Sequence, residues 1–191
     1  MELATLLERC RAGNELAWEA LVRTYQGRVY GLSFHYLGDA EEARDVAQEI
    51  FVRIFRNLDD CEDEARFVPW MLRIARNACI DHIRRRKARP PARDVPVEDM
   101  HDLASPSRGP DDALDDRARK RWVHEGIQSL GPLNREIIVL KDIQGLSLEE
   151  IAKILGIPLG TVKSRCNRAR LELARKLSAL TGRRYGAENI G

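Results

Sequence analysis

Residues 145–170 read GLSLEEIAKILGIPLGTVKSRCNRAR, and this pattern predicts two short helices joined by a tight turn. Apolar residues of the first helix recur at the i, i+3, i+4, i+7 spacing of one helical face: Leu148, Ile151, Ala152 and Leu155. Ser147 and Glu150 form the S-x-x-E capping box, which satisfies free backbone N–H groups where a helix begins. Gly156 and Pro158 then end this helix.

The second helix of this stretch carries polar side chains on its outer face. Its inward stripe is expected to be Val162, Cys166, Ala169 and Leu173. The residues left mostly outward are Lys163, Ser164, Asn167, Arg168 and Arg170. An exposed helix with such donors can lie in the major groove of DNA. The stretch therefore predicts a helix-turn-helix that reads DNA.

Composition limits the class of protein. The chain has 191 residues, enough for two small domains or one medium one, and 32% of them are charged. No apolar run approaches the roughly 20 residues that span a bilayer. The N-terminus lacks the basic region and cleavage site of a signal peptide. We expect a cytoplasmic protein without membrane insertion.

The net charge of +2 hides a strong asymmetry along the chain. Residues 84–89 are basic, residues 98–116 are acidic, and cations dominate again over residues 163–184. This distribution fits an anionic polymer bound at two separate places, although each run taken singly also fits a solvated surface.

The cysteines predict neither a metal site nor a disulfide framework. Cys10, Cys61, Cys79 and Cys166 stand far apart, with no C-x-x-C pair. Cys79 and Cys166 occupy apolar helix positions, where a thiol acts as a small core residue. Cys61 lies in a polar segment and is expected to be exposed. No cofactor, metal or small-molecule substrate is expected.

Proline placement predicts the domain organisation. Five of the eight prolines fall within residues 90–110, so we place a flexible, acidic, proline-rich linker at residues 89–112. It separates two helical blocks without a strand pattern, residues 1–88 and 113–182, and a polar tail follows at 183–191. The predicted fold is all-α, with two small helical domains joined by a flexible linker, the second containing the helix-turn-helix.

Four helices are expected in the first block: Leu3–Arg11, Glu15–Leu37, Ala40–Leu58 and about Val68–Lys87. Asn14 and Asp39 would cap the second and third. The third is expected to bury Val46, Ile50, Ile54, Phe55 and Leu58. In the second block we expect helices near Leu114–Leu130 and Asn134–Asp142 before the helix-turn-helix.

Three motifs together resemble one family. They are residues 45–55 (DVAQEIFVRIF); residues 67–77 (FVPWMLRIARN) with Asp81, Arg84 and Arg85; and residues 130–140 (LGPLNREIIVL) followed by Ala152 and residues 160–165 (GTVKSR). With them the chain resembles bacterial RNA polymerase sigma factors, the small extracytoplasmic-function (ECF) group of the sigma-70 family. The resemblance covers nearly the whole chain in the family's order.

The resemblance implies a dock for core RNA polymerase on the 45–55 helix. The polymerase would contribute its β′ clamp here and its β flap elsewhere. The docking residues would be Asp45, Gln48, Glu49 and Arg53, whose side chains can form charge-assisted hydrogen bonds. Taken alone, these residues also fit a solvated helix face. An anti-sigma factor is the further partner implied, covering this face or wedging between the domains.

The resemblance also implies contact with the promoter's minus-10 element. A protein can open a DNA duplex without hydrolysing ATP if it binds one separated strand more tightly than it binds the paired duplex. A flipped base would enter the loop at residues 59–66, whose acids either point away or bond a base amine. The expected set is Arg66, Phe67, Trp70, Arg73, Arg76, Asn77, Arg84 and Arg85, with Phe67 and Trp70 behind the loop.

The helix-turn-helix would read the minus-35 element as duplex. Lys163 can donate to guanine, Asn167 can pair with adenine, and Ser164 can serve a base or a phosphate. Cations expected on phosphates are Arg165, Arg168 and Arg170. Thr161 would help place a phosphate at the helix N-terminus. The acidic linker would thread toward the RNA path of the polymerase or act as a tether.

Three other readings stay open at this point. A helix-turn-helix regulator acting without polymerase would need a dimerisation surface or ligand pocket, and the sequence shows neither. A nuclease could use Asp81 and His82 or the acidic loop, but the chain has no H-E-x-x-H, phosphate loop or nucleophile elbow. A sigma-like decoy would keep the dock and lose the DNA donors, which are present here.

Overall fold

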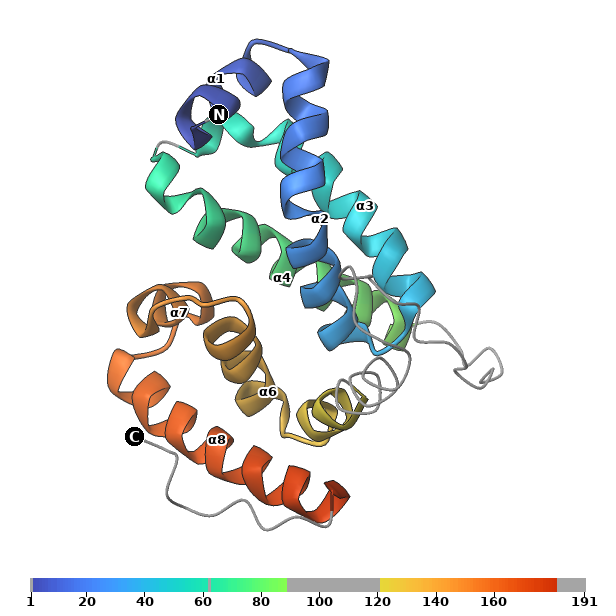
Figure 1. The fold of residues 1–191 in the computed structure, drawn as a ribbon, viewed down its shortest axis with the longest axis vertical. Coiled ribbons are helices and arrows are strands. Elements are labelled where there is room, and N and C mark those ends of the chain that lie inside the picture. Colours follow the sequence, from blue (N-terminus) through green and yellow to red (C-terminus); the bar gives the residue numbers. More distant parts are fainter. Residues whose placement is uncertain (1, 62, 89–120, 182–191) are drawn as a thin grey trace, which may run out of the picture. The chain divides into compact units, whose positions relative to one another are not determined.

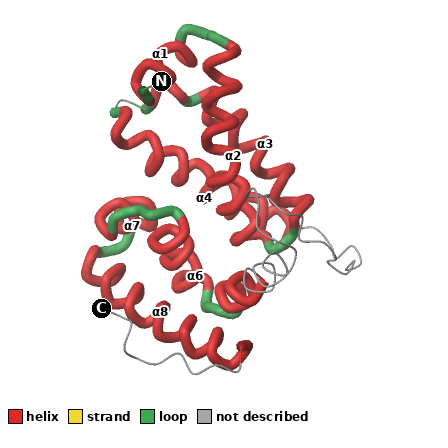
Figure 2. Tube along the Cα trace, viewed as in Figure 1, coloured by secondary structure: helices red, strands yellow, loops and turns green. Residues whose placement is uncertain are grey.

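The computed structural model describes residues 2–61, 63–88 and 121–181. The chain divides into two compact units, residues 1–103 and 104–191 (Figure 1). Every regular element among the described residues is helical (Figure 2), so the predicted all-α, two-unit fold is confirmed. The expected linker at 89–112 and the tail at 183–191 lie outside the described residues. No helix in the described part is both long and apolar enough to cross a bilayer.

Four helices build the N-terminal unit: α1 (Leu3–Arg11), α2 (Glu15–Leu37), α3 (Ala40–Arg56) and α4 (Phe67–Ala88). Helix α2 packs against the other three, and α3 also packs against α4. The largest fully buried side chains of the N-terminal unit are Leu7, Leu21, Leu32, Ile50, Ile54, Phe67, Met71 and Leu72.

Local signals set the ends of these helices as predicted. The Asn14 side chain accepts a hydrogen bond from the Ala17 amide at 2.9 Å, and Asp39 accepts one from the Glu42 amide at 2.8 Å. Gly38 ends α2 with φ +76°, a conformation that favours glycine. Helix α3 ends at Arg56, two residues before the expected end, and Leu58–Asp60 forms a separate 3₁₀ turn, η1.

Two expectations about burial in this unit are wrong. Phe55 is 53% exposed, and Phe51 is the phenylalanine of α3 that enters the core. Phe55 lies at the margin of the buried stripe, where its ring meets Trp18 of α2 edge-on, with 5.1 Å between centroids. Cys61 is buried rather than exposed, and its thiol donates to the Asp63 carbonyl at 3.6 Å.

The C-terminal unit begins, in the described part, with a helix at residues 121–128. It continues with α6 (Pro132–Ile138), η3 (Val139–Ile143), α7 (Leu148–Leu155) and α8 (Leu159–Thr181). Helices α6 and α7 both pack on α8. The expected helix at Asn134–Asp142 begins earlier, at Pro132, and ends in the widened π-type turn η3, where the Gln144 amide reaches the Val139 carbonyl at 2.9 Å.

The helix-turn-helix forms with the predicted signals. Glu150 accepts from the Ser147 amide at 2.7 Å and donates its own amide to the Ser147 hydroxyl at 3.2 Å, which completes the capping box. Gly156 ends α7 with φ +66°. The buried stripe of α7 centres on Ile151 and Ile154. Leu155 remains half-buried.

Candidate nucleic-acid interface

Helix α8 presents a row of polar side chains at its N-terminal half. Val162, Cys166 and Ala169 are buried against the rest of the unit, which fixes the rotation of the helix. The opposite face exposes Lys163, Ser164, Asn167 and Arg168, while Thr161 and Arg165 are half-buried. Lys163 and Asn167 are four residues apart and therefore neighbours on one face. The two side chains predicted to read bases, Lys163 and Asn167, are thus brought together beside the exposed Arg168.

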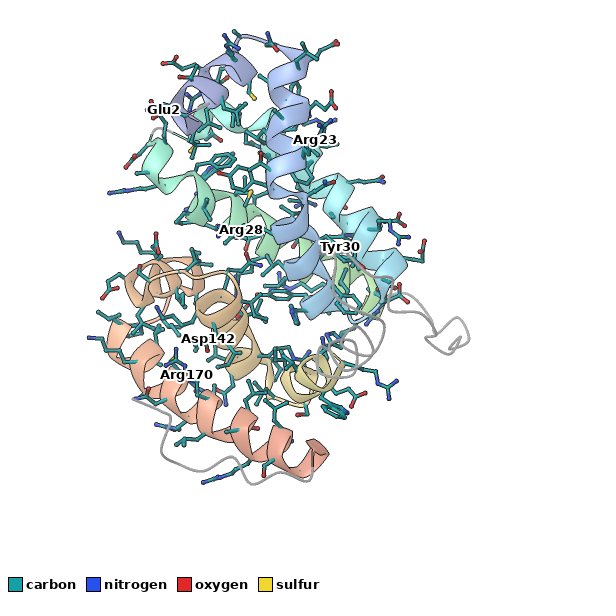
Figure 3. All side chains as sticks on the ribbon, viewed as in Figure 1. Glu2, Arg23, Arg28, Tyr30, Asp142 and Arg170 are labelled. Carbon is teal, nitrogen blue, oxygen red and sulfur yellow. The ribbon has the colours of Figure 1, made fainter. Side chains whose placement is uncertain are left out.

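Arg170 has a partner inside its own unit. Its guanidinium makes two hydrogen bonds to Asp142 of η3, from Nε to Oδ2 at 3.2 Å and from the terminal nitrogen to Oδ1 at 2.5 Å (Figure 3). The hydrogen bond with Asp142 raises the pKa of Arg170 above its ordinary value. Arg170 therefore ties α8 to η3 within this unit, and its expected phosphate contact stays a prediction.

A network of charges joins α3 to α4. Glu49 accepts hydrogen bonds from Arg53 at 2.6 Å and from Arg85 at 3.5 Å, and Arg53 also reaches Asp81 at 3.5 Å. The hydrogen bond from Arg53 lowers the pKa of the Glu49 carboxyl. Two predicted docking residues and one predicted minus-10 residue are therefore held in one network.

The same seam continues with residues that the sequence pattern did not single out. Glu42 of α3 accepts from Arg86 of α4 at 2.8 Å and lies 3.5 Å from His82 Nε2. Beyond the network, Asp45 and Gln48 are exposed on α3. Within the described residues, neither side chain forms a hydrogen bond or an ion pair.

An apolar patch flanks this polar face of α3. It consists of two exposed apolar side chains that are neighbours on one face of α3, Val52 and Phe55, beside the half-buried Trp18 of α2. Clusters of exposed apolar residues are typical of interaction sites. The sequence pattern missed this patch because Phe55 has the spacing of the buried stripe of α3. The way α2 packs on α3 nevertheless leaves the Phe55 side chain exposed.

The predicted minus-10 residues divide into a buried and an exposed group. Phe67 and Trp70 are core side chains, and Phe67 packs edge-on against Tyr25 at 5.2 Å. They support the loop from behind, so they offer no face on which a base could stack. The exposed members are Arg66, Arg73, Asn77, Arg84 and Arg85, while Arg76 is half-buried. Positions 73, 77 and 84 share one face of α4.

The acids of the loop between α3 and α4 are partly neutralised. Asp63 pairs with Arg66 at 3.2 Å and accepts the Ala65 amide at 2.9 Å, and Asp59 lies 4.0 Å from Arg11. Glu62 lies outside the described residues. The described part of the chain contains no group of three or more His, Cys, Asp or Glu side chains arranged to hold a metal ion.

Comparisons with known proteins identify the family. The family model described as Sigma-70 region 2 matches residues 21–89, and the one described as Sigma-70, region 4 matches residues 120–173. RNA polymerase sigma-H factor of Pseudomonas aeruginosa is 37% identical over 184 residues, covering 92% of this chain and 93% of that protein. ECF RNA polymerase sigma factor SigW of Bacillus subtilis is 34% identical, with 94% and 99% covered.

Solved structures agree with this result. CnrH, in complex with the cytosolic domain of CnrY, matches with a TM-score of 0.63 and 29% identity, covering 92% of this chain and 96% of that one. The chain therefore belongs to the sigma-70 family of RNA polymerase sigma factors, in the extracytoplasmic-function group. It is a promoter-specificity factor and not an enzyme, so the nuclease, the independent regulator and the decoy are set aside.

Proposed function

We propose that the two units divide promoter recognition between them. Residues 1–88 dock on core RNA polymerase and hold the minus-10 element, and residues 113–182 read the minus-35 element. The observation that carries this assignment is that each of the two units exposes a face of cationic and polar side chains, on α4 in one and on α8 in the other. A sigma factor with both faces can span two promoter elements at once.

The docking surface combines a polar face and an apolar patch. Asp45 and Gln48 supply free hydrogen-bonding groups, while Glu49 and Arg53 form the edge of the charge network. Val52 and Phe55 lie on the same helix and would be buried by the β′ clamp of the polymerase. An apolar centre with a polar rim is the usual anatomy of a protein interface.

The minus-10 face lies on α4 and the loop before it. Arg73, Asn77 and Arg84 follow one side of α4 and can bind successive phosphates of a separated strand. Arg66 and Arg76 extend this face, and Phe67 and Trp70 position it from the core. Arg85 is shared, because Glu49 of the docking surface already accepts its hydrogen bond.

The minus-35 face lies on α8. Lys163 and Asn167 would donate to base edges, and Ser164 would serve a base or a phosphate. Arg165 and Arg168 would contact phosphates, with Thr161 at the helix N-terminus. Arg170 stays on Asp142 and keeps α8 in register for these contacts.

Two further assignments follow from the family. We assign an anti-sigma factor as a partner that competes for the docking surface, since the sigma factor RpoE of Bartonella quintana is solved in complex with the anti-sigma factor NepR. The β flap is assigned to the C-terminal unit. Since transcription takes place in the bacterial cytoplasm, we place the protein there.

A mobility-shift experiment tests this function against a DNA-binding protein that acts alone. Promoter DNA is incubated with the protein, with core RNA polymerase, and with both. We expect a specific complex only when both are present. Tight, sequence-specific binding by the protein without polymerase would contradict the proposed function.

A further inference from the structure

The last residue of α1 contacts the loop between α3 and α4. A terminal nitrogen of Arg11 donates a hydrogen bond to the Cys61 carbonyl at 2.6 Å, across 50 positions of sequence. Arg11 Nε also lies 4.0 Å from the Asp59 carboxylate. Helix α1 precedes the residues matched by the region 2 family model, which begin at residue 21. The contact therefore joins the candidate base-capture loop to an element outside that match.

The position of Arg11 is fixed by a rigid corner. Helix α1 ends at Arg11, and Gly13 adopts φ +77° in the turn that follows. The Asn14 amide donates to the Arg9 carbonyl at 3.0 Å, while the Asn14 side chain caps α2. The Arg11 side chain is only 29% exposed. The hydrogen bonds of this turn therefore set the direction in which α1 ends, and with it the position of the Arg11 guanidinium beside the loop.

Among the described residues, the hydrogen bond from Arg11 is the polar contact that joins the Cys61 backbone to another helix. The Cys61 amide donates a hydrogen bond to the Leu58 carbonyl at 3.2 Å, and the Cys61 thiol donates one to the Asp63 carbonyl at 3.6 Å. Both partners are near neighbours in sequence, so these bonds shape the loop without tying it to the helices. The Cys61 carbonyl is instead held by a cationic donor, and such hydrogen bonds are stronger than neutral ones.

We infer that Arg11 is a positioning residue for recognition of the minus-10 element. It holds the backbone at Asp59–Cys61 in the conformation that receives a flipped base, and it offsets the negative charge of Asp59 beside the DNA phosphates. Preorganisation of this kind improves binding because the ordering cost is met before the strand arrives. Arg11 has this role only if the loop at residues 59–66 captures a flipped base, as the family resemblance implies.

Three substitutions separate the two parts of this role. Arg11→Ala removes both the hydrogen bond and the charge. Arg11→Gln keeps a neutral donor, and Arg11→Lys keeps the charge on a single nitrogen that cannot serve both partners in the same fork geometry. Arg23→Ala is the matched control, because Arg23 is an exposed cation of the same unit that pairs with Glu19 on its own helix.

The first measurement uses holoenzyme reconstituted with core RNA polymerase. Initiation is compared on templates that vary each minus-10 base, beside core affinity and the thermal midpoint of the free protein. For Arg11→Ala we expect discrimination at one minus-10 position to fall about tenfold, with core affinity unchanged. Arg11→Gln and Arg11→Lys should fall between this variant and the wild type, and Arg23→Ala should match the wild type.

The second measurement needs no DNA. Cys61 is 2% exposed, so we expect iodoacetamide to modify it slowly in the wild type and at least several-fold faster in Arg11→Ala. Unchanged minus-10 discrimination in a folded Arg11→Ala variant would overturn the role of Arg11. An equal loss of core affinity and discrimination would also overturn it, by indicating general damage to the unit. Failure of the wild type to initiate with polymerase would instead refute the proposed function itself.

Discussion

Replacing Arg170 by alanine separates a structural role from a DNA-binding role. The substitution removes two hydrogen bonds to Asp142, between side chains that are 39% and 34% exposed. Exposed ion pairs contribute about 0.2–1 kcal/mol, and bidentate geometry places this pair at the upper end, so we expect a loss of about 1 kcal/mol in the C-terminal unit. DNA binding should keep its dependence on salt, because no phosphate contact is lost.

Two measurements on the full chain test these values. Hydrogen exchange of the α7 and α8 amides reports the opening free energy of the C-terminal unit, in a double-mutant cycle with Asp142→Ala. The coupling free energy between Arg170 and Asp142 should account for most of the loss in opening free energy. The slope of log affinity against log salt, measured with holoenzyme, falls by about 0.9 for each phosphate contact removed.

Arg168→Ala is the matched control, because Arg168 is an exposed arginine two positions before Arg170 on the same helix. It should lower the salt slope by about one unit and leave hydrogen exchange unchanged. The reasoning is refuted if Arg170→Ala lowers the salt slope like Arg168→Ala while leaving the exchange of α8 at its wild-type rate. In that case Asp142 would be an incidental neighbour of a phosphate-binding arginine.

Three further predictions concern the two faces and the core. Lys163→Ala and Asn167→Ala should each relax base preference at one minus-35 position by about 1–3 kcal/mol in binding to systematically substituted promoters, and a uniform loss at every sequence would contradict base reading. Phe55→Asp should reduce affinity for core polymerase at least about tenfold and lower the thermal midpoint only slightly, because Phe55 is already 53% exposed and loses mainly its edge contact with Trp18. Unchanged affinity would remove the apolar patch from the docking surface. Burial raises the pKa of the Cys79 thiol from 9.0 to about 11, so the unfolded chain ionises first and urea melts should show stability falling between pH 9 and about pH 11. If the Cys79→Ala variant loses stability over the same pH range, the loss belongs to other titrating groups.

Helix ends and caps could be predicted because their signals are local. Asn14, Asp39 and the Ser147–Glu150 box each act within three residues of their own position, and all three form as expected. The amphipathic stripes were predicted well at their centres and poorly at their margins. Phe55 continues the apolar spacing of α3, yet the packing of the neighbouring helices leaves it 53% exposed.

Long-range partners could not be predicted in the same way. Arg170 has the spacing of an outward cation, and only the widened turn at η3 brings Asp142 within hydrogen-bond distance. Arg11 and Cys61 are 50 residues apart and belong to no common motif. The burial of Cys61 follows from the same fold-level placement, since its sequence neighbours are acidic. These features depend on how helices pack, which periodicity alone does not specify.

Transcription in vitro with core RNA polymerase over a randomised promoter library tests the central claim most directly. The account predicts transcripts only when the protein is added, from templates enriched in two separated sequence elements. Asp45→Arg on the docking surface should abolish these transcripts, and Lys163→Ala should change the upstream element alone. Transcripts without two enriched elements, or none above the level of core polymerase, would contradict a two-point promoter reader.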